Sequence, residues 1–190
     1  EAVRFYTVCA ENDDPVAQRT IGFMHLKGKG IPKNPQLAVR WLKAAADNGD
    51  PNAMYRLGQM YDEGTGDSDP DLKTAVQWYE RAADAGDRDA QFAMGCIHSM
   101  PRTRWTSDSK AAAMFLKAAE QDHDEAQYQI GMMLAYGQGV NRDPSQAVYW
   151  LERSSENGYQ QAMVDLANMS FEGKALPQDY AKAAKWFTEA

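Results

Sequence analysis

The sequence is poor in cysteine, in basic charge and in long apolar runs, and each shortage excludes a class of protein. Two cysteines among 190 residues are too few for a disulfide framework. Lysine and arginine total 20 against 27 aspartates and glutamates, a formal net charge of −7, so the chain lacks the cationic excess that attracts nucleic acid or anionic lipid. No apolar run approaches the roughly 20 residues that a membrane-spanning helix needs. We therefore expect neither nucleic-acid binding nor direct membrane insertion.

Patterns typical of catalysis or metal binding are also scarce. Cys9 and Cys96 have no CxxC spacing and no nearby histidine, so we expect two free thiols rather than a zinc site. His25 and His98 lie 73 residues apart (98 − 25 = 73), too far along a stack of helices to share a metal ion. No serine or cysteine belongs to a recognisable nucleophile motif. The sequence predicts no catalytic residue, no metal site, no cofactor and no enzymatic activity.

The first residue is Glu1 rather than methionine, and no leader of basic and then apolar residues follows it. We therefore expect the chain to be part of a longer protein, with any targeting peptide outside it. Cytoplasmic, periplasmic and secreted locations all remain open.

What the sequence does have is an internal repeat. The leading alanines of a nine-residue block are spaced by 36, 37, 36 and 36 residues, and five residues later each block has a glycine, or Ala167 in the last copy. The leading alanines are Ala17, Ala53, Ala90, Ala126 and Ala162, and a second block begins at Ala38, Ala75, Ala112, Ala147 and Ala183. We interpret the chain as one domain, 1–190, made of a half-repeat 1–14, repeats 15–50, 51–87, 88–123 and 124–159, and a partial repeat 160–190.

Both blocks have helical periodicity. Ala53, Leu57 and Tyr61 fall at i, i+4 and i+8, and the second block repeats the same pattern, whereas period-2 alternation is scarce. Predicted N-caps stand four residues before the second block, at Asn34, Asp71, Asp108, Asp143 and Asp179. Each repeat is therefore a helix–turn–helix pair, which buries its apolar face only by stacking on its neighbours.

Three further features occur in fixed order within the repeats. Leu57-Gly58-x2-Tyr61 is followed by a Gly-x-Gly turn and then by a second helix with a large aromatic residue. The turns are Gly28/Gly30, Gly64/Gly66 and Gly137/Gly139, and the aromatic residues are Trp41, Trp78, Phe115, Trp150 and Trp186. This combination resembles the Sel1-like repeat family, close relatives of tetratricopeptide repeats. The resemblance implies an all-α, right-handed α-solenoid, a bacterial source and a role as a protein-interaction scaffold.

One stripe on the first helices is a candidate partner-binding surface, because the resemblance places these helices on the concave face. Two rows lie two and six residues after the leading alanines, so they share a helical face. They are either packing between hairpins or a peptide groove anchored by aromatic residues. The candidate contact residues in these rows are Arg19, Phe23, Tyr55, Gln59, Phe92, Tyr128 and Met132.

Trp105 is the last candidate contact residue. The third repeat has Met100-Pro-Arg-Thr-Arg-Trp105 where the others have Gly-x-Gly. Trp105 either folds back over the neighbouring helices or projects with Arg102 and Arg104 as an interface residue.

The function predicted is that of a non-catalytic scaffold or adaptor that binds a protein or peptide along the concave face. The alternative is a regulatory or localising segment of a longer chain whose active domain lies outside this fragment. Phe5 and Trp186, in the two terminal helices, are expected to face solvent, which predicts end-to-end self-association.

Overall fold

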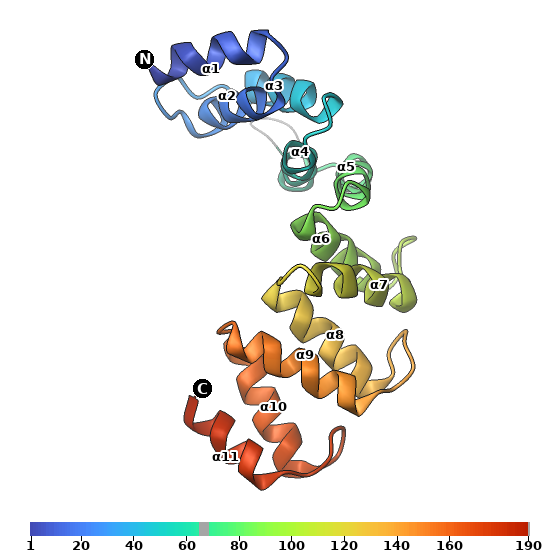
Figure 1. The fold of residues 1–190 in the computed structure, drawn as a ribbon. Coiled ribbons are helices and arrows are strands. Elements are labelled where there is room, and N and C mark those ends of the chain that lie inside the picture. Colours follow the sequence, from blue (N-terminus) through green and yellow to red (C-terminus); the bar gives the residue numbers. More distant parts are fainter. Residues whose placement is uncertain (65–68, 190) are drawn as a thin grey trace. The chain divides into compact units, whose positions relative to one another are not determined.

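The computed structural model describes residues 1–64 and 69–189, and these residues form only α-helices and the loops that join them. The all-α repeat fold predicted from the sequence is therefore confirmed. The helices within these ranges are Ala2–Glu11 (α1), Pro15–Lys27 (α2), Pro35–Asp47 (α3), Pro51–Glu63 (α4), Leu72–Asp84 (α5), Arg88–Ser99 (α6), Asp108–Ala119 (α7), Asp124–Tyr136 (α8), Pro144–Glu156 (α9), Gln160–Glu172 (α10) and Tyr180–Glu189 (α11) (Figure 1).

The chain forms two compact units, an N-terminal unit, Glu1–Ala90, and a C-terminal unit, Gln91–Ala190. In the N-terminal unit α2 pairs with α3 and α4 with α5, while α1 packs on α2 and α3 on α4 (Figure 1). In the C-terminal unit α8 pairs with α9 and α10 with α11, while α7 packs on α8 and α9 on α10. Each unit is thus a stack of helical hairpins.

Side-chain caps determine where the helices begin. The Asp14 and Asp50 carboxylates accept hydrogen bonds from the Ala17 and Ala53 amides at 2.7 and 2.8 Å, with a proline at the first helical position. The predicted caps of the second helices are found at Asn34, Asp71, Asp143 and Asp179.

The third repeat departs from the predicted register. Its second helix is capped by Ser107, whose Oγ accepts from the Lys110 amide at 3.4 Å, and not by Asp108. Serine caps as well as aspartate, and Asp108 then lies in the first turn, where a negative charge favours the helix. A run of three alanines, Ala111 to Ala113, follows and carries no side-chain pattern that fixes the register.

Glycines of the first helices leave room for large side chains of the second helices to pack against the backbone. A Cβ built on Gly58 would lie 2.5 Å from the Tyr79 ring, and one on Gly95 would lie 2.5 Å from the Phe115 ring. Phe115 therefore takes the position of Tyr79, and its predicted equivalence to the tryptophans is wrong by one residue. In the last repeat Ala167 replaces the glycine, and Phe187, at the corresponding spacing, is 51% exposed.

Buried glutamines connect successive turns. Gln18 Nε2 donates to the Ala10 carbonyl at 3.1 Å, and its Oε1 accepts from Asn48 Nδ2 at 3.0 Å. Gln127 makes the same pair of bonds in the C-terminal unit, to the Ala119 carbonyl and from Asn157. A side-chain amide thereby satisfies buried polar groups at equivalent points of both units.

Trp186 is buried, so the expectation that it faces solvent at the end of the chain is wrong. It is only 2% exposed and belongs to an apolar cluster with Ala175 and Leu176 of the loop before α11, which cover it. Phe5, by contrast, is 66% exposed, as expected. Both cysteines are free thiols, which confirms that prediction.

Candidate protein-binding surface

The predicted contact residues are all half-buried, and all except Trp105 lie on first helices. In the N-terminal unit they are Arg19 and Phe23 on α2, with Tyr55 and Gln59 on α4. In the C-terminal unit they are Phe92 on α6, Tyr128 and Met132 on α8, and Trp105 in the loop before α7.

Three residues of the first row contact capping positions of the next first helix, whereas Tyr55 contacts the Tyr79 ring of its own hairpin. In each pair the second residue precedes that helix directly and follows its partner by 31 positions. The pairs are Arg19 with Asp50 (Nη1 to Oδ2, 3.0 Å), Phe92 with His123 (ring centroids 4.3 Å apart) and Tyr128 with Tyr159 (5.3 Å). This row therefore contributes to packing between repeats, whatever partner its exposed edges contact.

Trp105 makes its contacts within its own region of the chain. The Arg104 guanidinium lies 4.2 Å from the centroid of the Trp105 ring. His98 Nδ1 donates to the Trp105 carbonyl at 2.7 Å, which ties the loop back to α6.

A groove opens between α2 and α4 in the N-terminal unit, with a cavity volume of about 810 Å³. Phe23 and Gln59 both line it, so the structure brings these two predicted contact residues together. The remaining lining residues are Leu26, Lys27, Lys33, Pro35, Arg56, Met60, Glu63 and Gly64. We call this surface the α2–α4 groove.

Arg56 is the central cation of the α2–α4 groove. Its guanidinium carbon lies 5.5 Å from the centroids of both the Phe23 and the Tyr55 rings, within the range of a cation–π contact. Nη1 donates to Gln59 Oε1 at 2.6 Å, and Gln59 Nε2 in turn donates to Tyr55 Oη at 2.9 Å. Arg56 Nε is buried and has no hydrogen-bond partner among the described residues. The chain thus orients this guanidinium, and within the same residues Nη2 makes no hydrogen bond.

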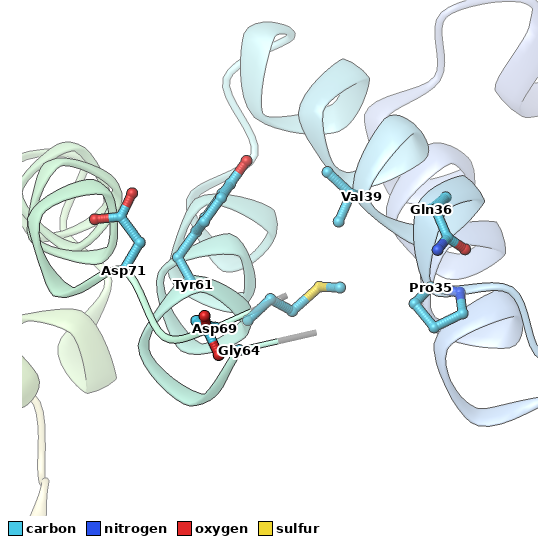
Figure 2. A pocket seen from close by; sticks show the side chains of 8 residues that line it. Pro35, Gln36, Val39, Tyr61, Gly64, Asp69 and Asp71 are labelled. Atoms are coloured by element: carbon cyan, nitrogen blue, oxygen red, sulfur yellow. The ribbon is translucent and has the colours of Figure 1, made fainter. Parts of the chain in front are cut away.

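A second hollow, of about 440 Å³, lies across the amino end of α3 and the carboxyl end of α4 (Figure 2). Figure 2 shows Pro35, Gln36 and Val39 on one side of it and Tyr61 and Asp71 on the other. None of the predicted contact residues lines it. The predicted turn residue Gly66 lies outside the described residues.

Burial raises the pKa of Tyr55, of Tyr128 and of the Cys96 thiol, because it disfavours their charged forms. Burial and then the adjacent Asp165 carboxylate, which accepts from Tyr128 Oη at 2.8 Å, raise the pKa of Tyr128. Burial, followed by the charge of Asp89, raises the pKa of Tyr55. Burial also raises the pKa of the Cys96 thiol to about 11. These side chains are therefore uncharged near neutral pH.

The described residues include no group of three or more histidine, cysteine, aspartate or glutamate side chains arranged to hold a metal ion. Within the same part of the chain, no helix has both the length and the apolarity needed to cross a membrane.

Sequence reasoning missed the three cations of the α2–α4 groove. Arg56, Lys27 and Lys33 stand 3, 10 and 16 residues after their leading alanines (56 − 53, 27 − 17, 33 − 17). At these positions the later repeats carry mostly neutral or acidic residues, for example Asp165 and Tyr136. The pattern of apolar residues does not identify these cations, whereas a comparison of the charge at equivalent positions of the aligned repeats does.

Similar proteins of known structure have the same helical-repeat fold. A Sel1 repeat protein from Oxalobacter formigenes is 31% identical, with a TM-score of 0.85 over 94% of this chain and 73% of that one. A protective antigen of uropathogenic Escherichia coli strains that displays an SLR fold is 30% identical, with a TM-score of 0.83 over 98% of this chain. The chain spans only 40% of the length of that antigen. Comparison with curated proteins gives no match.

The family model described as Sel1 repeat matches residues 15–50, 51–87, 88–123, 124–159 and 160–190. Sel1 repeats are generally protein–protein interaction modules, and proteins built from them are typically non-catalytic scaffolds. From five consecutive matches, and from the glycine-mediated packing of the first four of these hairpins, we conclude that the chain belongs to the Sel1 repeat family.

Proposed function

We propose that this chain is a non-catalytic scaffold that binds a protein or peptide on the exposed face of its first helices. The observation that carries the proposal is the α2–α4 groove, in which Phe23 and Gln59 line an open cavity of about 810 Å³. A groove with an aromatic wall and oriented polar groups offers both apolar contact and hydrogen bonds to an incoming chain.

The chemistry of the surface favours a protein partner over nucleic acid. Phe23 supplies the rigid aromatic contact that often carries most of the binding energy in a protein interface. The formal net charge of −7 opposes the phosphate backbone, whose attraction to cations supplies most of the affinity for nucleic acid.

Selection from a library of random twelve-residue peptides displayed on phage tests the proposal with the full chain. Phe23→Ala should weaken an enriched peptide at least tenfold, which corresponds to about 1.4 kcal/mol. Phe187→Ala, which truncates an exposed phenylalanine of α11, serves as the matched control and should leave the affinity unchanged. Enriched peptides that bind folded Phe23→Ala and Gln59→Ala proteins as tightly as the original chain would contradict the proposal.

We also propose weak self-association through the exposed apolar residues of the terminal helices. Phe5 and Val8 of α1 are 66% and 55% exposed, and Phe187 of α11 is 51% exposed. Apolar side chains exposed in this way at each terminal helix lose contact with water when two chains associate.

A further inference from the structure

We propose that the α2–α4 groove recognises an acidic segment of the partner, a peptide with at least two carboxylates beside an apolar side chain. Arg56 would pair with one carboxylate and Lys27 or Lys33 with another, while Phe23 receives the apolar side chain. This inference rests on the proposed function and specifies the chemistry of the partner.

The first support is the state of Arg56. Among the described residues its one hydrogen bond goes from Nη1 to Gln59, a neutral acceptor, and no carboxylate lies within ion-pair distance of it. The charge of Asp87 interacts with Arg56 only at longer range. A guanidinium held between two aromatic rings has lost part of its freedom before binding, so less entropy is lost when a carboxylate arrives. Its fork of donors matches the two oxygens of a carboxylate.

The second support is the charge of the groove. Lys27, Lys33 and Arg56 line it, and Glu63 is the one carboxylate among the described lining residues. Neither lysine has a side-chain hydrogen bond or ion pair within the described part of the chain. The described lining of the groove thus has three cations and one anion, whereas the chain as a whole has a formal net charge of −7. The rest of the surface therefore repels an acidic peptide on average, which confines its binding to this groove.

The third support is the equivalent hollow of the C-terminal unit, which has the same fold but different charges. It lies between α8 and α10, and its lining includes Arg142, the counterpart of Lys33 (142 − 126 = 33 − 17 = 16). Arg142 Nε and Nη2 donate to the carbonyls of Ala135 and Ala175 at 3.0 and 2.8 Å, so its donors bind the chain itself. The counterpart of Arg56 is Asp165, which accepts from Tyr128.

The C-terminal unit shows which cations the packing of a repeat does not require. The repeat packs without cations at the positions of Arg56 and Lys27, whose counterparts are Asp165 and Tyr136. In the C-terminal hollow Lys174 is also paired, to Glu172 at 3.1 Å. The cations of the α2–α4 groove have no ion-pair partner in the described part of the chain and are not explained by stability of the repeat, and a bound acidic segment accounts for them.

The experiment uses the same phage-displayed library of random twelve-residue peptides, selected at low salt against the full chain and its variants. The pool enriched by the original chain should contain more aspartate and glutamate than the starting library. Arg56→Gln should remove that enrichment and weaken an enriched acidic peptide by about tenfold or more in fluorescence anisotropy. The affinity of that peptide for the original chain should also fall as salt is raised.

Three further variants, one test and two controls, keep the experiment decisive if Arg56→Gln fails to fold. The double variant Lys27→Gln/Lys33→Gln changes only exposed side chains and should also reduce the acidic enrichment. Arg40→Gln on α3 and Lys174→Gln in the C-terminal unit remove one cation each outside the groove and should leave the enrichment intact. An enriched pool without acidic bias, or an acidic bias unchanged in the double variant, overturns the inference. Peptides that depend on Phe23 but lack acidic bias would overturn this inference alone, whereas peptides that do not depend on Phe23 would overturn the proposed function.

Discussion

The Phe92 ring of α6 stacks on the His123 imidazole, with ring centroids 4.3 Å apart and planes tilted by 23°. His123 is the N-cap of α8, so a side chain from the middle of one first helix contacts the starting point of the next. Arg19 and Asp50 make the corresponding contact in the N-terminal unit through an ion pair. One position of the repeat thus joins successive first helices by stacking in one place and by charge in another.

Phe92→Ala tests how much this contact stabilises the C-terminal unit. The substitution removes the stacking on His123 and the contact with Phe115, whose ring centroid lies 5.7 Å away. We expect a loss of about 2 kcal/mol, below the 3–5 kcal/mol of a fully buried phenylalanine because Phe92 is half-buried. Urea unfolding monitored by circular dichroism measures the loss. Phe187→Ala should change stability by less than about 0.5 kcal/mol, and an equal loss in both variants would refute the expectation.

Gly58→Ala should destabilise the chain even though alanine favours helices by about 1 kcal/mol over glycine. The new Cβ would lie 2.5 Å from the Tyr79 ring, which is buried and cannot move aside freely. Overpacking of this kind costs about 1–3 kcal/mol, measurable as a lower urea midpoint. In the double variant Gly58→Ala/Tyr79→Leu the two losses should not add, because the ring that clashes is gone. A more stable Gly58→Ala protein would show that the hairpin relaxes.

We expect the free energy of unfolding to fall at alkaline pH because of Cys96. Burial and the charge of Glu125 raise the pKa of its thiol in the folded chain from 9.0 to about 11. Between pH 9 and about 11 the unfolded chain loses the thiol proton while the folded chain keeps it. The contribution of Cys96 to the free energy of unfolding is therefore fully present below pH 9 and is lost as the pH rises to about 11. Unfolding of Cys96→Ala should therefore depend less steeply on pH across this window. Parallel curves for the two proteins would rule out the assignment.

Trp105→Ala separates the two interpretations of the loop in the third repeat. Trp105 is half-buried, and Arg104 covers its ring at 4.2 Å, which favours a packing role. We expect a loss of about 1–2 kcal/mol and a drop of several degrees in the melting temperature by calorimetry. Unchanged stability together with loss of a bound peptide would instead identify Trp105 as an interface residue.

Phe5→Ser/Val8→Ser tests self-association. Both side chains are exposed on α1, so their replacement should lower the tendency to associate without loss of folded structure. Sedimentation velocity at millimolar concentration measures the shift toward monomer. A strict monomer for the original chain under the same conditions would disprove self-association.

The parts of the fold that the sequence alone determined are those with local physical causes. The helical period of the apolar residues, the aspartate and asparagine caps and the Gly-x-Gly turns between the two helices of a repeat act within a few positions of each other. The repeat of about 36 residues copies these local signals along the chain, so the all-α hairpins could be predicted. Where the local signals were ambiguous the prediction was wrong, as in the third repeat, where Ser107 competes with Asp108 as the cap.

Only the tertiary structure decided which side chains are buried, paired or left open. Trp186 is buried in a cluster that includes Ala175 and Leu176 of the loop before α11, residues outside its own helix. Arg56 and Lys33 line one groove although 23 residues separate them (56 − 33 = 23), because α4 and the loop after α2 both border it. Lys33 and its counterpart Arg142 occupy the same position of the repeat, yet among the described residues Arg142 donates to two carbonyls and Lys33 to none. Charge pairing depends on distances between helices, and those distances exist only once the hairpins have packed.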